Sequence, residues 1–410
     1  MTTIFVAYRI CEMLSSSRSY IAFSVFSVLL VACQPKTEKV NATPRFHDVP
    51  GKTAIMPLAY QDTTLPQYER MIERLDSFYK VQVRGGFNGS VLIGHEGKIV
   101  YERYFGHARK EGSVPLQSNS STQLASISKT FTGAATLYLH QHNYLNINDP
   151  VSNYLSGFPY KDITVKMLLN HRSGLPDYQK WDKRYVPNAN APMSNAQMLN
   201  ILVRHKPALE SRPDTRFKYC NTNYALLANI IEKVTEMKYE DFMQRYMFEP
   251  LGMNNTFVYR SPQTLPANAS GNYKYNWVRW DNNFADGVVG DKGIYSTVQD
   301  MYRWDQSFYE GKLLTNETIE LSYGPCSFEK PGVKNYGLGW RLLCYPSGNK
   351  VIYHNGWWHG SNTVFYRFIK DNLTFIVLGN RYNTGIYRQA KVLYSIVKNV
   401  PVGSDFDDEG

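Results

Sequence analysis

A serine and a lysine three residues apart, Ser126 and Lys129, have the spacing of a nucleophile and its base. On a helix, this spacing places the two side chains one turn apart on the same face, where they can share a proton. The pattern from residue 122 onward predicts a helix that begins near Ser126 and continues through Leu139. Because a helix N-terminus directs free N–H groups at a reacting carbonyl, Ser126 is the predicted nucleophile.

The same serine–lysine spacing occurs at four further places, so the spacing alone does not identify a nucleophile. These pairs are Ser77 and Lys80, Ser327 and Lys330, Ser347 and Lys350, and Ser395 and Lys398. Only Ser126 has the context of a helix start followed by a small-residue stretch. We therefore expect no catalytic role for the other four serines.

A second element, Tyr219-Cys220-Asn221, comes just before a helix predicted over residues 223–236. The Tyr219 hydroxyl could pass a proton to a leaving group, and the Asn221 amide could hold an amide of the substrate. Tyr144-Leu145-Asn146 has the same spacing but lies at the end of the nucleophile helix. We interpret that second tripeptide as an ordinary connection.

A third element, His354-Asn355-Gly356, lies on a predicted strand. The glycine would let a substrate lie against the strand edge, and the N–H of Trp357 could face an oxyanion. The segment His95-Glu96-Gly97 repeats the histidine–glycine spacing and is interpreted as a hairpin turn. Each element alone is more often structural than catalytic. Together, in this order and in these settings, the three elements predict a serine hydrolase that forms a covalent acyl-enzyme.

These elements resemble those of the serine β-lactamase and penicillin-binding-protein superfamily, in particular the branch of class C β-lactamases, D-alanyl-D-alanine carboxypeptidases and esterases. The resemblance spans about residues 67–398 and includes the segments 145–150, 168–175 and 293–297. It implies that Ser126 is acylated, that Lys129 and Tyr219 transfer protons, and that Asn221 binds the substrate amide. The N–H groups of Ser126 and Trp357 would form the oxyanion hole.

The third element departs from the pattern of this branch. Its β-lactamases generally carry Lys-Thr-Gly where this chain carries His354-Asn355-Gly356. A lysine is a permanent cation for a substrate carboxylate, whereas a histidine is largely neutral at envelope pH. We therefore expect activity on D-amino-acid peptides, peptidoglycan fragments or related amides and esters. The alternatives are a true class C-type β-lactamase and a non-catalytic penicillin-binding or peptidoglycan-binding lipoprotein.

The elements that must position these residues form strands at both ends of the chain, with helices between them. A helix over 67–80 is followed by a hairpin of 90–94 and 98–105, and the segment from about 144 to 290 is mainly helical. Later strands are predicted at 336–343, 350–356, 363–369 and 373–378, with a closing helix over 385–398. The expected fold is α+β, of the β-lactamase/transpeptidase type. Its antiparallel sheet is built from both termini and flanked by helices, with an inserted helical subdomain.

The first 33 residues have the pattern of a lipoprotein signal peptide. An apolar run from Ile21 to Val31 is too short to span a membrane and leads to Leu30-Val31-Ala32-Cys33, which resembles a lipobox. Cys33 would carry the lipid, although plain secretion is the alternative. We expect a tether over 34–65, the hydrolase domain over 66–400 and an acidic tail over 401–410. The protein would be lipid-anchored in a bacterial cell envelope, facing the periplasm or the exterior.

Composition limits the partners. The chain has 410 residues and a formal charge of +10, but its Lys and Arg are scattered among acids, so nucleic-acid binding is not expected. No His/Cys cluster has metal-ligand spacing, so neither a metal nor another cofactor is expected. Cys326 and Cys344 could pair or stay separate thiols. We expect a monomer that acts on a small-molecule or peptide substrate.

Overall fold

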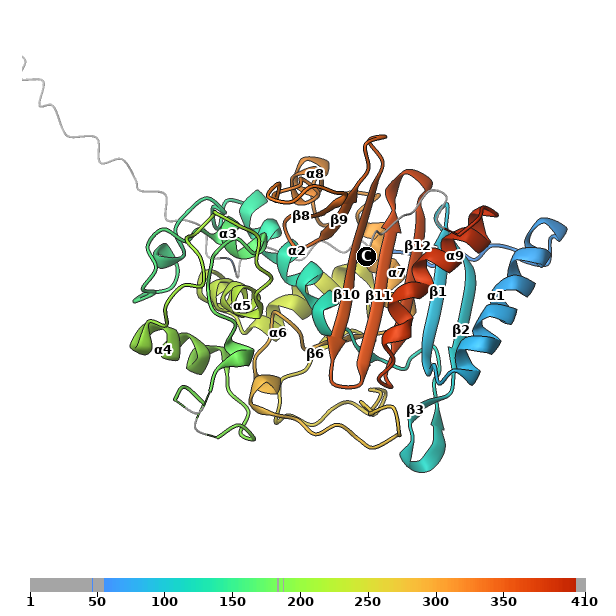
Figure 1. The fold of residues 1–410 in the computed structure, drawn as a ribbon, viewed down its shortest axis with the longest axis horizontal. Helices are drawn as coiled ribbons and strands as arrows, with labels where there is room; N and C mark the ends of the chain where they lie inside the picture. Colours follow the sequence, from blue (N-terminus) through green and yellow to red (C-terminus); the bar gives the residue numbers. More distant parts are fainter. Residues whose placement is uncertain (1–45, 47–54, 183, 187, 403–410) are drawn as a thin grey trace, which may run out of the picture. The chain divides into compact units, whose positions relative to one another are not determined.

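The computed structural model describes residues 46, 55–182, 184–186 and 188–402. In this part of the chain, seven antiparallel strands form the central sheet, in the order β2-β1-β12-β11-β10-β9-β8 (Figure 1). The strands are β1 (Gly89–His95), β2 (Lys98–Phe105), β8 (Lys334–Tyr336), β9 (Arg341–Cys344), β10 (Lys350–Trp358), β11 (Ser361–Phe368) and β12 (Leu373–Gly379).

The two ends of the chain meet inside this sheet. Strand β1 pairs with β12 from Gly89 opposite Gly379 to His95 opposite Leu373. Strands β1 and β2 form the predicted hairpin, and its turn residues Glu96 and Gly97 have φ values of 51° and 78°. Two positive φ values in succession are what a tight hairpin turn requires. The prediction of a sheet built from both termini is confirmed.

Side chains alternate between the two faces of the sheet, because successive residues of a strand point to opposite sides. Val91 and Val377 pack with helices α1 (Pro66–Arg84) and α9 (Gln389–Lys398) on one face. Figure 1 shows these two helices crossing in front of the sheet. Leu92, Ile376 and Leu378 point the other way, into the larger core, where α7 (Val298–Ser307) covers β1 and β12. The nucleophile helix α2 (Ser128–Gln141) contributes to this larger core.

The described part of the segment 144–290 contains four α-helices, of which α5 is the longest. They are α3 (Val165–Leu169), α4 (Asn195–His205), α5 (Asn221–Thr235) and α6 (Tyr239–Met243). A small sheet of β5 (Thr122–Gln123), β7 (Ile294–Ser296) and β6 (Phe257–Val258) joins this region to the nucleophile turn. Strand β6 falls inside the segment that the sequence pattern assigns to helices. The rest of the described segment consists of helices and helical turns joined by long loops, so it is less helical than the sequence pattern predicts.

The remaining elements are short. They are β3 (His107–Arg109), β4 (Val114–Pro115), α8 (Asn316–Ser322), a π-helical turn η6 (Gln244–Phe248) and the 3₁₀ turns η2 (Glu111–Ser113), η3 (Ala125–Ile127), η4 (Val151–Asn153), η5 (Tyr178–Lys180), η7 (Glu249–Leu251), η8 (Phe284–Gly287), η9 (Ile369–Asp371) and η10 (Thr384–Arg388). Two of these 3₁₀ turns form the start of helices that the sequence pattern predicts as continuous. The nucleophile helix begins with η3, and the closing helix begins with η10 before it continues as α9.

One predicted strand is wrong, because the run 336–343 is two strands, β8 and β9, separated by a turn. The Gly337 N–H donates to the Trp340 carbonyl at 2.9 Å, and Gly339 has a φ of 96°. The β-rich composition of the run hides this turn, since Leu338 between the two glycines and Trp340 after them are as apolar as strand residues.

The predicted signal peptide, Cys33 and the acidic tail beyond residue 402 lie outside the described residues. The end of the predicted tether is described, and it packs on the domain. Phe46 and Met56 are buried in the larger core, and the Met56 N–H donates to the Leu251 carbonyl at 3.2 Å. The domain therefore includes residues before 66. Among the helices that the structure describes, none is both long and apolar enough to cross a membrane.

Cysteine pairing is settled for the described thiols. Cys326 and Cys344 are both free, as is the buried Cys220. The Cys326 thiol donates to the Gly324 carbonyl at 3.4 Å. Of the two alternatives that the sequence allows, the structure has separate thiols.

Candidate active site

Ser126 lies in the turn η3, which is held in an unusual backbone conformation. The preceding residue, Ala125, has a φ of 50°, a left-handed value that a residue with a Cβ rarely adopts. Two bonds to Leu124 hold the turn: its N–H donates to the Ile294 carbonyl at 2.8 Å, and its carbonyl accepts from the Thr363 hydroxyl at 2.8 Å. Backbone strain of this kind concentrates at functional sites.

Lys129 is completely buried and makes three polar contacts through its amine. The Nζ atom lies 3.1 Å from Ser126 Oγ, 2.9 Å from Asn221 Oδ1 and 2.8 Å from the Asp291 carbonyl oxygen. The amide and carbonyl oxygens can only accept, whereas the serine hydroxyl can also donate. A neutral amine therefore donates to the two oxygens and accepts from Ser126, and the ammonium formed by proton transfer donates to all three. This geometry suits a nucleophile and the base that takes its proton.

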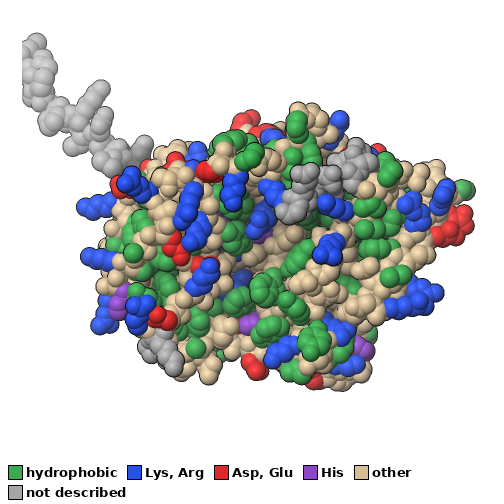
Figure 2. Space-filling model, in the orientation of Figure 1, with side chains coloured by type: hydrophobic (Ala, Val, Ile, Leu, Met, Phe, Trp, Pro, Cys, Tyr) green, Lys and Arg blue, Asp and Glu red, His purple; other side chains and the backbone are tan. Residues whose placement is uncertain are grey.

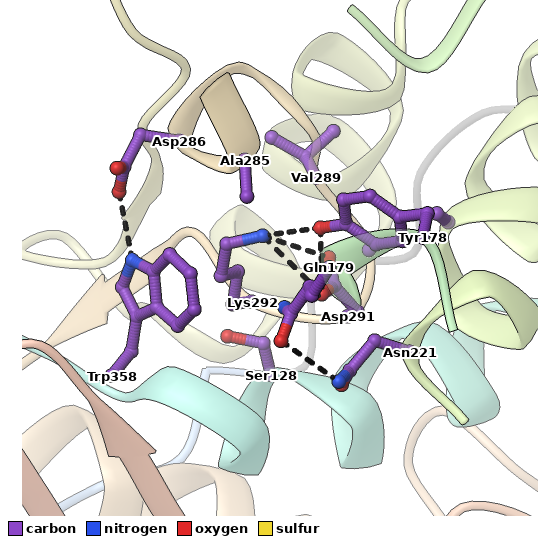
Figure 3. Close-up of polar contacts among 12 residues, drawn as sticks. Ser128, Tyr178, Gln179, Asn221, Ala285, Asp286, Val289, Asp291, Lys292 and Trp358 are labelled. Carbon is purple, nitrogen blue, oxygen red and sulfur yellow. Dashed lines mark hydrogen bonds and ion pairs between the residues drawn. The ribbon is translucent and has the colours of Figure 1, made fainter. Parts of the chain in front are cut away.

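Asn221, at the start of α5, is oriented by the residues behind it. Its Nδ2 donates to Asp177 Oδ2 at 3.0 Å and to Gln179 Oε1 at 3.0 Å, which turns its Oδ1 toward Lys129. Figure 3 shows the contact between Gln179 and Asn221. Both amide hydrogens are thus used within the protein. The predicted bond from Asn221 to a substrate amide requires one of these contacts to open.

Lys129 and Asn221 belong to a ring of hydrogen bonds that includes residues that sequence reasoning missed. Figure 3 shows Gln179, Asp291, Lys292 and Tyr178 in contact with one another. Gln179 Nε2 donates to Asp291 Oδ2 at 3.1 Å, and the Asp291 carbonyl returns to Lys129. The buried Lys292 pairs with the Asp291 carboxylate at 3.3 Å and donates to the Tyr178 hydroxyl at 2.5 Å. These residues could have been found from their positions in the sequence. Tyr178 and Gln179 come shortly after the segment 168–175, and Asp291 and Lys292 directly precede the segment 293–297.

Asp177 carries the second carboxylate of this wall of the site. Burial raises its pKa, and the neighbouring Asp291 carboxylate adds to the effect. The Asp177 side chain accepts from the Gln179 N–H at 3.1 Å as well as from Asn221. It therefore fixes the side-chain amide of Asn221 and the backbone at Gln179.

The Tyr219 ring lies near two basic side chains. Lys129 Nζ is 4.9 Å from the centre of its ring and the Arg341 guanidinium carbon is 5.1 Å from it. The Tyr219 hydroxyl is buried and has no hydrogen-bond partner among the described residues. A buried hydroxyl is costly to leave unbonded, so this oxygen suits a bond to a substrate or leaving group. His171 supports the tripeptide: its ring stacks on Tyr219 at 4.3 Å, and its Nδ1 accepts from the Cys220 N–H at 3.2 Å.

His354 does not lie in the wall of the site. Its ring is completely buried, with Nδ1 facing the Asn355 carbonyl at 2.8 Å and Nε2 facing the Tyr336 hydroxyl at 3.2 Å. Burial holds the pKa of His354 well below the ordinary histidine value, and the guanidinium of Arg341 lowers it further. Although His354 belongs to the third predicted element, this placement keeps its ring from contact with a substrate in the cavity. Arg341, the first residue of β9, is a cation that does lie on the cavity wall.

Gly356 has a packing role in addition to the predicted one. A Cβ at this position would overlap the Leu124 carbonyl oxygen and lie 3.2 Å from the Ala125 Cβ. The glycine therefore lets the nucleophile turn pack directly on β10. Strand β9 pairs with β10 only as far as Tyr353, so on this side the edge of β10 beyond Tyr353 has no neighbouring strand among the described residues. Asn355, Gly356 and Trp357 lie along this edge.

A cavity of about 740 Å³ brings these groups together. Its wall includes Ser126, Tyr219, Asn221, Asn355, Gly356 and Trp357 of the predicted site; the aromatic residues Trp280, Tyr353, Trp358 and Tyr387; and the charged residues Asp177, Lys180, Asp291, Lys292, Lys334 and Arg341. None of the four other serines with a lysine three residues later is part of this wall. Of the five serines, only Ser126 lies on this wall.

Known proteins show the same fold and family. Residues 75–393 match the Beta-lactamase family model. The chain is 33% identical to a penicillin-binding protein of Bacillus subtilis over 78% of this chain and 74% of the relative. It is 25% identical to a D-aminopeptidase of Brucella anthropi, over 82% of this chain and 63% of that protein. A penicillin-binding protein structure from Bacillus halodurans superposes with a TM-score of 0.69 at 21% identity, over 79% of this chain and 98% of that one, and so supports the fold. The chain therefore belongs to the Beta-lactamase family, within the superfamily of serine β-lactamases and penicillin-binding proteins.

Proposed function

We propose that this protein is a serine hydrolase that forms an acyl-enzyme on Ser126 and acts on D-amino-acid peptides, peptidoglycan fragments or related amides and esters. The observation that carries the proposal is the buried Lys129 amine 3.1 Å from Ser126 Oγ, at the wall of the cavity. The similarity to a D-aminopeptidase supports the D-amino-acid substrate class. Membership of the carboxypeptidase and esterase branch, a monomeric state, and envelope anchoring through Cys33 belong to the same proposal.

The proposed reaction has two stages. Lys129 takes the proton from Ser126 as its Oγ attacks the substrate carbonyl, and Tyr219 gives a proton to the departing amine or alcohol. Water then attacks the ester carbonyl and releases the acid. The N–H groups of Ser126 and Trp357 would stabilise the oxyanion. Their proximity is supported by Gly356, whose packing under the nucleophile turn brings the following residue beside it.

Arg341 supports a substrate with a free carboxylate. Its side chain lies over the Tyr219 ring and makes no ion pair with a described carboxylate. Strand β9 begins at Arg341 and runs antiparallel to β10. A peptide that lies antiparallel along the open edge of β10 would therefore point its C-terminal carboxylate at this guanidinium.

The test of the proposed function is intact-mass measurement after exposure to a labelled penicillin and to a panel of activated esters. One acyl group per chain is the expected product. A β-lactamase would give rapid turnover of the penicillin, whereas a D-amino-acid peptidase or esterase would hold the penicilloyl group and turn over the esters. If no compound gave an adduct or turnover, the remaining hypothesis would be a non-catalytic binding protein.

Arg341→Gln should lower kcat/KM for a carboxylate-bearing ester relative to a matched neutral ester. We expect the ratio to fall by about 10-fold to 100-fold, because a charge-assisted hydrogen bond is worth about 1.5–3 kcal/mol. Lys180→Gln, which removes an exposed cation from the same wall, should change the ratio much less. Since burial keeps the pKa of His354 low, the wild-type ratio should stay flat from about pH 6 to pH 8. A ratio that rises toward acid pH would instead indicate that protonated His354 binds the substrate carboxylate.

A further inference from the structure

A tight turn beside the cavity mouth presents apolar side chains to solvent. Tyr273 and Arg279 form an antiparallel bridge, and the Lys274 N–H donates to the Val278 carbonyl at 2.8 Å. Trp277 has a φ of 67°, and its N–H donates to the Lys274 carbonyl at 3.0 Å. At this turn Tyr275 is 69% exposed and Val278 is 50% exposed. In Figure 1 the turn belongs to the gold loops that run below β10 and β11.

Basic side chains cover the indole rings of this region. Lys110 Nζ lies 5.2 Å from the centre of the Trp277 ring, and the Arg381 guanidinium carbon lies 4.8 Å from it. Lys274 Nζ lies 5.7 Å from the Trp280 ring. Arg381 also donates through Nε to the Tyr275 carbonyl at 2.7 Å, which ties it to the turn. We define the basic-aromatic patch as Lys110, Lys274, Tyr275, Trp277, Val278, Arg279, Trp280 and Arg381.

The charge of the basic-aromatic patch is positive. All four of its charged residues are Lys or Arg, while the bordering acids are Glu111 and Asp281. The Tyr273 hydroxyl donates to Glu111 and holds the pKa of that carboxylate below its usual range. The whole chain has a formal charge of +10, and Figure 2 shows basic side chains spread over the face it draws, with acidic ones scattered among them. An anionic surface is therefore the complementary partner.

The chemistry of the patch favours a lipid surface over a glycan. A sugar ring stacks on an open aromatic face, but cations already lie over the Trp277 and Trp280 rings. Tyrosine and tryptophan with adjacent Lys and Arg suit the headgroup region of a bilayer, because rings and lysine stems enter the apolar boundary while charges stay in water. Exposed Tyr275 and Val278 add the apolar contact that such binding needs.

We propose that the basic-aromatic patch is a docking surface for anionic lipid and that it holds the mouth of the catalytic cavity at a membrane surface. Trp280 is a member of both the patch and the cavity wall, so the two are continuous. Aromatic contacts also connect the patch with the cavity wall. The centre of the Tyr382 ring lies 6.2 Å from the ring centres of both Trp280 and Trp357. The proposal does not depend on which acyl compound the site hydrolyses.

The test is binding of the full chain to vesicles of phosphatidylcholine alone and of phosphatidylcholine with phosphatidylglycerol. Every protein carries Cys33→Ser, so no lipid can be attached there and the residues before 46 contribute equally to each arm. Lys274→Gln/Arg279→Gln should lower the partition coefficient on anionic vesicles by roughly fivefold for each basic residue removed. The loss should shrink at high salt. Tyr275→Ser/Val278→Ser should weaken binding to both kinds of vesicle.

The matched control is Lys161→Gln/Lys330→Gln, which removes the same charge from exposed positions outside the patch. We expect it to keep wild-type binding within about twofold. Equal losses in the patch and control variants would overturn the proposal, because net charge alone would then explain them. Vesicle binding that is unchanged in both patch variants, with loss of binding to purified peptidoglycan instead, would assign the patch to a glycan and likewise overturn it.

Discussion

Ser126→Ala is expected to abolish covalent labelling and to lower turnover by a factor on the order of 10⁴ to 10⁶. The reason is that no other described hydroxyl on the cavity wall lies within hydrogen-bond reach of the Lys129 amine. Intact mass after exposure to an activated ester measures the label, and steady-state kinetics measure the turnover. Folding should be preserved, since the change removes one oxygen from a residue at the cavity wall.

The controls are the four other serines that precede a lysine by three residues. Ser77 and Lys80 are both exposed on α1, outside the cavity. Ser395 donates to the Val400 carbonyl at 2.5 Å, and Lys398 pairs with Asp371 at 3.0 Å. Alanine at Ser77, Ser327, Ser347 or Ser395 should leave labelling intact. Label that survives Ser126→Ala would refute the nucleophile assignment and with it the proposed mechanism.

Gly356→Ala should lower both the stability of the protein and its acylation rate. Its Cβ would overlap the Leu124 carbonyl oxygen and the Thr363 hydroxyl, so the nucleophile turn must move away from β10. Overpacking of this kind typically costs about 1–3 kcal/mol of unfolding free energy. A displacement of about 1 Å between reacting groups can lower the rate about 100-fold. Denaturant unfolding and the acylation rate give the two measurements.

A suitable control is Gly85→Ala, because Gly85 has a φ of −76° and a Cβ there would be 3.3 Å from its nearest neighbour. We expect little change in the acylation rate of this variant. If Gly356→Ala acylates at the wild-type rate, the packing of the nucleophile turn on β10 is not needed to align Ser126. A loss of stability without a loss of rate would give the same conclusion.

Local sequence determined the elements with strong short-range signals. The β1–β2 hairpin follows from two alternating runs and a turn with a glycine, and the strands β10, β11 and β12 follow from β-rich runs bounded by turns. Ser126 and Lys129 could be paired from sequence because one helical turn fixes their separation. The split between β8 and β9 could not be predicted, since the turn at Gly337 depends on a bond to Trp340 rather than on a break in composition.

Only the tertiary structure decided which residues surround the predicted site. Asn221 reaches Lys129 from 92 positions away, and the Asp291 carbonyl reaches it from 162 positions away. The motif containing His354 gives no sign that its ring is buried, because strand alternation decides which side chains face the cavity and which face the core. Arg341 stands on the cavity wall because β9 begins there.

The basic-aromatic patch shows the same division between sequence and structure. Lys274, Trp277 and Arg279 are close in sequence, so their shared turn is a local property. Lys110 and Arg381 join them only because folding brings both over the Trp277 ring. Sequence spacing fixes which groups share one turn of backbone, whereas contacts between distant segments depend on packing the whole core. For this reason the proximity of Ser126 and Lys129 was predictable from the sequence, while the cavity wall and the patch beside it required the fold.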